Sequence, residues 1–104
     1  MYMILQLNKE NYLDDVIMAL TEAGIEDTVV LSGESLGHKL VFDNPLFAGF
    51  RKSLGSEKGY ANLIFAPASE EQIDFMLEEL KNANIDFIQS ELGKIILLPV
   101  AKIY

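Results

Sequence analysis

Side chains that could carry catalysis are few in this chain of 104 residues. His38 is the only histidine, and the chain contains no cysteine. Thiolate chemistry is therefore excluded, and a transition-metal site would depend on carboxylates. The serines lie in no nucleophile motif. We predict no catalytic residue and no metal site.

Three adjacent carboxylate pairs could in principle support general acid–base chemistry. They are Asp14–Asp15, Glu70–Glu71 and Glu78–Glu79. Each pair falls in a segment with helical periodicity, mostly on its polar side. Acidic residues early in a helix also interact favourably with the helix dipole. We therefore interpret these pairs as solvated surface charges.

Apolar runs and amphipathic segments predict the elements that must position any site. Four runs predict strands, at 2–7, 27–32, 60–68 and 94–100. Apolar residues at helical spacing predict two helices, one within NKENYLDDVIMALTEAG (8–24) and one over EEQIDFMLEELKNAN (70–84). Asn8 or Asn11 could cap the first helix and Gly24 would end it, whereas Ser69 and Gln72 form a capping box for the second.

The resulting order, β-α-β-β-α-β, predicts an α+β protein with a ferredoxin-like sandwich. Two right-handed crossovers place both helices on one face of a four-stranded antiparallel sheet. The strands are apolar on both faces, so the second face would expose a large apolar surface. We expect this face to be covered by self-association in a closed homo-oligomer.

A long insertion, residues 34–58, joins the second and third strands, where a hairpin needs only about two to five residues. Insertions of this length are usually functional. Asn44–Pro45 is a helix-start signal, and apolar residues then recur at helical spacing. We predict a short amphipathic helix near 45–54.

The predicted helix carries aromatic and basic side chains: Phe47, Phe50, Arg51 and Lys52. Residues 34–58 contain four basic and three acidic residues, in a chain whose net charge is −8. The helix either packs on its own domain and shields a sheet edge, or it presents these side chains to a partner. Both alternatives stay open.

Length, charge and hydropathy exclude several classes of protein. A chain of 104 residues has room for one hydrophobic core. The net charge of −8 argues against general nucleic-acid binding, which needs a basic surface. The apolar runs of the chain are far shorter than the roughly 20 residues that span a bilayer. The first residues show no signal-peptide pattern, and we expect a cytoplasmic protein.

Four stretches resemble the PII signalling proteins, in the same order and at similar spacing. LDDVIMALTEAGI (13–25) resembles the first helix of the family, which reads close to LDDVREAL followed by a Gly-Ile turn. GESLG (33–37) resembles the KGFG-type segment that leads into the family's T-loop, and the insertion takes the place of that loop. GKIILLPV (93–100) resembles the strand GKIFVLPV.

The resemblance implies one PII-like domain over residues 1–104 and a regulatory homotrimer that is not an enzyme. PII proteins bury their sheet faces in the trimer, bind ATP or ADP in clefts between subunits, and dock the T-loop on other proteins. By resemblance, a nucleotide or another anionic small molecule would bind at Gly37, Gly93 and Lys94. Phe47, Phe50, Arg51 and Lys52 would contact the regulated protein.

The phosphate-binding loop is where the chain departs from the family pattern. The family reads TGxxGDGK, whereas NANIDFIQSELGK (82–94) stands at that place. Only Gly93 and Lys94 match, and Glu91 and Leu92 replace a glycine and the aspartate. Two alternatives therefore stay open: a PII-like scaffold that binds a protein partner without any small molecule, and a metal-binding or anion-binding trimer of the CutA kind.

Overall fold

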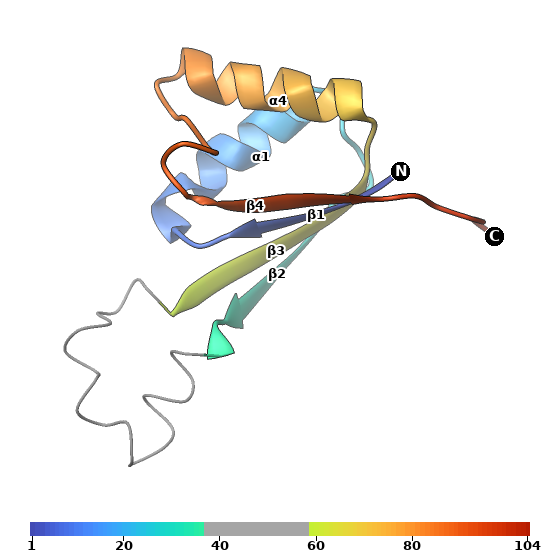
Figure 1. Ribbon diagram of the computed structural model, residues 1–104, viewed down its shortest axis with the longest axis horizontal. Coiled ribbons are helices and arrows are strands. Elements are labelled where there is room, and N and C mark those ends of the chain that lie inside the picture. Colours follow the sequence, from blue (N-terminus) through green and yellow to red (C-terminus); the bar gives the residue numbers. More distant parts are fainter. Residues whose placement is uncertain (37–58) are drawn as a thin grey trace.

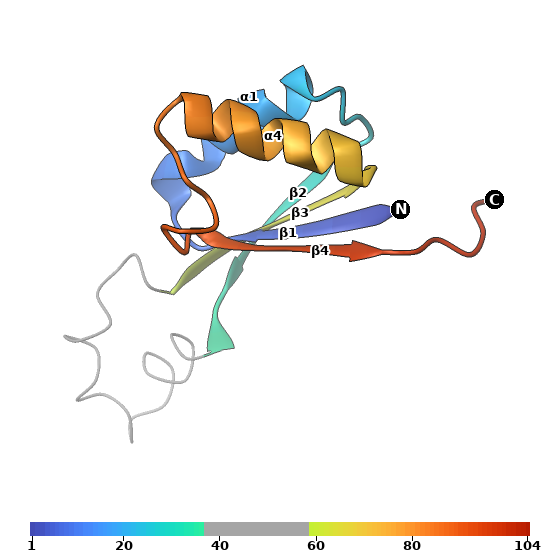
Figure 2. The same ribbon diagram turned by 45° about the horizontal axis from the view of Figure 1, so that its top comes forward.

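The computed structural model describes residues 1–36 and 59–104, which form a four-stranded sheet with two α-helices. The elements follow in the order β1 (Tyr2–Leu7), η1 (a 3₁₀ turn, Glu10–Tyr12), α1 (Leu13–Glu22), β2 (Val29–Glu34), β3 (Tyr60–Pro67), α4 (Glu70–Asn82) and β4 (Gly93–Leu98). The spatial order of the strands is β2-β3-β1-β4, and every neighbouring pair is antiparallel. Both helices lie on one side of the sheet (Figures 1 and 2). The predicted ferredoxin-like α+β fold is confirmed.

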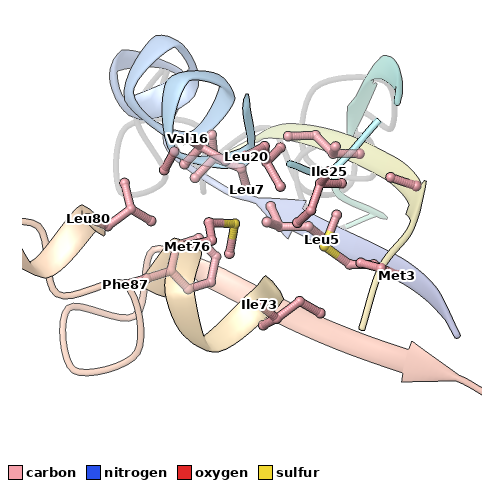
Figure 3. Close-up of a cluster of buried hydrophobic side chains, with 14 of the residues drawn as sticks. Met3, Leu5, Leu7, Val16, Leu20, Ile25, Ile73, Met76, Leu80 and Phe87 are labelled. Carbon is pink, nitrogen blue, oxygen red and sulfur yellow. The ribbon is translucent and has the colours of Figure 1, made fainter. Parts of the chain in front are cut away.

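The core lies between the sheet and the two helices (Figure 3). Burial alternates along β1, where Met3, Leu5 and Leu7 are completely buried toward the helices. The helices contribute one stripe each, Val16, Ala19 and Leu20 from α1 and Ile73, Met76 and Leu80 from α4. This spacing of three and four residues is why both segments fold as helices against the sheet.

The start of α1 differs from the prediction. The helix follows the 3₁₀ turn η1, and its N-cap is Tyr12, which makes no side-chain capping bond. Asn8 and Asn11 lie four residues and one residue before this position, and Asn8 Oδ1 accepts a hydrogen bond from Gln6 Nε2 at 2.9 Å. The predicted cap at Asn8 or Asn11 was therefore wrong. The end of α1 at Gly24 is confirmed, since Gly24 has φ +74°, a conformation that favours glycine.

The capping box of α4 is confirmed. Ser69 Oγ accepts a hydrogen bond from the backbone amide of Gln72 at 3.2 Å, and the side-chain Oε1 of Gln72 accepts one from the backbone amide of Ser69 at 3.0 Å. Gln72 also donates from Nε2 to the carbonyl of Gly24 at 3.1 Å. Gln72, the third residue of α4, thus ties the start of that helix to the end of α1.

Two strands, β2 and β4, differ from the sequence prediction at both ends. β2 begins at Val29 rather than at residue 27, because Asp27 has φ +53° and cannot belong to an extended strand. β4 ends at Leu98 rather than at residue 100, since Pro99 has no amide donor for the ladder. Among the described residues, no helix is long and apolar enough to cross a bilayer. The helix predicted near 45–54 lies outside the described residues.

Candidate functional site

The face of the sheet opposite the helices is apolar, and we call it the open sheet face. Cross-strand pairs share a face, so the register places Ile4 beside Phe65 on one side and Ile96 on the other. The apolar members of the face are Tyr2, Ile4, Val29, Leu31, Leu63, Phe65, Ile96 and Leu98. Tyr2 and Phe65 stack with ring centroids 6.5 Å apart. The prediction that the strands are apolar on both faces holds for β1, β3 and β4, but it was wrong for β2, which places Val30, Ser32 and Glu34 on the helical side.

Several members of the open sheet face are exposed to solvent in the single chain. The exposed fractions are 53% for Val29, 52% for Leu31, 42% for Ile96 and 44% for Leu98. In Figure 2 this face is turned away from α1 and α4. A contiguous apolar surface across four strands is typical of an interaction surface rather than of a free monomer.

The insertion leaves the sheet at the same end as the Gly93–Lys94 pair. Leu7 at the end of β1 pairs with Asn62 of β3 on one side and with Gly93 of β4 on the other. With neighbouring strands about 4.8 Å apart, Asn62 and Gly93 lie roughly 10 Å from each other. The base of the insertion is closed by a hydrogen bond from the Ser35 amide to the Gly59 carbonyl, 2.9 Å long.

The predicted site residues are therefore only partly placed by the structure. Gly93 and Lys94 lie near the foot of the insertion, where Lys94 is exposed on the open sheet face in register with Gln6. Gly37, the third predicted ligand-binding residue, lies outside the described residues. The same holds for His38 and for the predicted partner-binding residues Phe47, Phe50, Arg51 and Lys52.

Gly93 has a packing role that the sequence did not indicate. A Cβ atom at this position would overlap the carbonyl oxygen of Gln6, and it would lie 2.8 Å from the Gln6 carbonyl carbon and 3.2 Å from Leu7 Cα. These are backbone atoms of β1, which cannot move aside as a side chain can. Only glycine lets β4 begin its pairing with β1 here.

Asn62 is the polar residue that sequence reasoning missed. Its side chain is completely buried, and its Oδ1 lies 3.3 Å from Ser32 Oγ and 3.4 Å from Tyr60 Oη, both of which donate to it. Among the residues that the structure describes, its Nδ2 has no hydrogen-bond partner. The signal was present in the sequence, since an asparagine interrupts the apolar run YANLIFAPA (60–68).

Replacing Asn62 by leucine should stabilise the protein by about 1 kcal/mol, because a buried donor without a partner costs about 1–3 kcal/mol. Both hydroxyls that lose their acceptor are only partly buried and can turn to water. Urea unfolding of Asn62→Leu beside the wild type measures the difference. A loss of stability instead would show that Nδ2 has a partner in solution.

The carboxylates on the helices include one interacting pair that the sequence did not indicate. A hydrogen bond to the Glu22 side chain raises the pKa of Glu79 above its usual range, with smaller contributions from desolvation and from the charges of Glu22 and Glu78. The packing of α4 against α1 thus brings two carboxyl groups together. No third ligand joins them, because within residues 1–36 and 59–104 no three acidic or histidine side chains could hold a metal ion.

Comparison with known proteins supports the fold. No protein-family model matches the sequence, and no curated protein matches it either. Among solved structures, the chain is similar to CPII, a nitrogen regulatory PII-like protein from Thiomonas intermedia K12 that was solved bound to ADP, AMP and bicarbonate. The TM-score is 0.52 and the identity 18%, over 91% of this chain and 79% of CPII. The chain therefore has the ferredoxin-like fold of the PII-like proteins, as its sequence resemblance implied.

Proposed function

We propose that this chain is a cytoplasmic PII-like regulatory protein, a single domain over residues 1–104 that acts as a homotrimer by binding and not by catalysis. The open sheet face is the observation that carries this proposal. Its aromatic and aliphatic side chains extend across all four strands, and several are about half exposed in the single chain. Burying this face against two further copies removes the apolar surface from water in a closed assembly.

The insertion at 34–58 would be the T-loop-like surface that docks on a regulated protein. Aromatic residues and arginine are enriched in protein interfaces, and Phe47, Phe50, Arg51 and Lys52 bring both kinds together. The insertion is joined to the sheet through β2 and β3, and the Ser35–Gly59 hydrogen bond lies at its base. A partner that contacts the insertion would therefore contact a segment that is anchored to β2 and β3 of the proposed trimer.

A variant of the insertion tests the docking proposal. Phe50→Ala combined with Arg51→Glu should lower recovery of a cross-linked partner from cell extract by about tenfold or more, since hot-spot truncations cost about 2 kcal/mol or more. The control is Met18→Ala, on the exposed surface of α1, where the side chain is 63% exposed. Equal recovery by both variants would contradict docking through the insertion.

A second candidate function is ligand sensing at the cleft between subunits. Two observations favour it: Gly93 and Lys94 lie at the same end of the sheet as the base of the insertion, and CPII was solved bound to ADP, AMP and bicarbonate. Gly37, Gly93 and Lys94 would then line a site for an anionic small molecule, ATP or ADP among them. A ligand there would favour one arrangement of the insertion over others.

A further inference from the structure

The turn at residues 86–92, between α4 and β4, stands where the PII family has its phosphate-binding loop. Four consecutive amides donate within the turn: Gln89 to Asp86 Oδ1 at 3.0 Å, Ser90 to the Asp86 carbonyl at 3.0 Å, Glu91 to the Ile88 carbonyl at 3.2 Å, and Leu92 to the Phe87 carbonyl at 3.2 Å. A loop that cradles phosphate instead points successive free N–H groups at the anion. In this turn those donors are already occupied.

Two core side chains hold the turn in this conformation. Phe87 and Leu92 are each only 2% exposed and belong to the main hydrophobic cluster. Figure 3 shows Phe87 pointing into that cluster. The carbonyl of Leu92 also accepts a hydrogen bond from the Asn8 amide at 2.8 Å, just after β1. Freeing the amides would mean withdrawing two apolar side chains from the core.

The surface beside the turn is acidic. A cavity of about 440 Å³ lies between α4 and the turn, lined in part by the carboxylates Asp74, Glu78 and Asp86. Lys81 is the one cation among the described residues that line it. Glu91 adds a fourth carboxylate in the turn itself and is exposed. A di- or triphosphate brought here would be repelled by more charges than attract it.

We infer that the 86–92 turn is closed to phosphate, so that this chain does not bind a nucleotide through the loop position that its fold suggests. The hydrogen bonding of the amides, the packing of the turn on the core and the surplus of negative charge each disfavour phosphate binding at this turn. The inference bears on the second candidate function, whose ligand it restricts to one bound without the amides of residues 89–92. It does not depend on the trimer or on docking through the insertion.

Amide hydrogen exchange, followed by NMR on the ligand-free 104-residue chain, tests the inference. The amides of Ser90, Glu91 and Leu92 should exchange at least roughly 100-fold more slowly than in an unstructured peptide. Adding ATP, ADP or AMP with Mg²⁺, or tripolyphosphate, each at millimolar concentration, should shift none of these resonances. The same samples are measured by light scattering.

The possible outcomes separate this inference from the proposed function. Unprotected amides at 90–92, or resonances there that move with nucleotide, would overturn the inference. A nucleotide that binds while these amides stay protected and unshifted must contact other groups, which supports it. A monomer by light scattering with a protected turn would contradict the trimer and leave the inference standing.

A pair of neighbouring substitutions tests the anchoring step. Phe87→Ala removes a core anchor and should speed exchange at Ser90 to Leu92 by about tenfold or more. Ile88→Ala is the matched control, because Ile88 lies in the same turn but is 57% exposed. Equal protection in the two variants would count against the inference. Should Phe87→Ala fail to fold, the wild-type exchange rates decide.

Discussion

Gly93→Ala is expected to lower the free energy of unfolding by about 3 kcal/mol, near the upper end of what overpacking costs. The new methyl group would overlap the Gln6 carbonyl oxygen and approach Leu7 Cα to 3.2 Å. Both belong to β1, the strand that lies between β3 and β4 in the sheet. Relief would require β4 to move away from β1 at the first pair of their ladder, Leu7 with Gly93.

Gly33→Ala provides the matched control for this prediction. Gly33 is also a strand glycine, but a Cβ there would lie 3.4 Å from the Ala61 carbonyl oxygen, an ordinary contact. Its change in stability should stay within about 0.5 kcal/mol. Urea unfolding of both variants at one protein concentration measures the two effects, because the stability of an oligomer depends on concentration. Similar losses in both variants would contradict the close approach at Gly93.

The fold was predictable because its signals are local. Ser69 and Gln72 lie three residues apart and mark the start of α4, and the glycine at 24 marks the end of α1. Apolar periodicity gave the helices and strands, and connection rules gave their arrangement. The errors were also local: the sequence does not reveal that a 3₁₀ turn precedes α1, or that Asp27 adopts a positive φ.

The site was less predictable because its properties arise between segments distant in the sequence. Gly93 matches a family motif, yet the reason it must be glycine is the backbone of β1, more than 80 residues earlier. Asn62 meets Ser32 only after β2 pairs with β3. The closure of the 86–92 turn depends on which acceptors its amides donate to, and the sequence IDFIQSEL does not indicate those acceptors.

Ile96→Lys should convert the proposed trimer to a monomer. Ile96 is 42% exposed in the single chain, so the new ammonium group can reach water there at a cost below about 1 kcal/mol. In a trimer with the open sheet faces inward, three such groups would be buried together. Each would lack a partner, which costs several kcal/mol per charge, and Lys94 on the same face adds a like charge.

Light scattering measures this effect as a fall in mass from three times 11.6 kDa to 11.6 kDa. Met18→Lys is the control, because Met18 is 63% exposed on α1, on the helical side of the sheet. It should keep the mass of the wild type. If Ile96→Lys remains a trimer, the open sheet face is not the interface. If Met18→Lys dissociates instead, the trimer interface lies on the helical side of the sheet. Something other than the trimer contact would then have to cover the open sheet face.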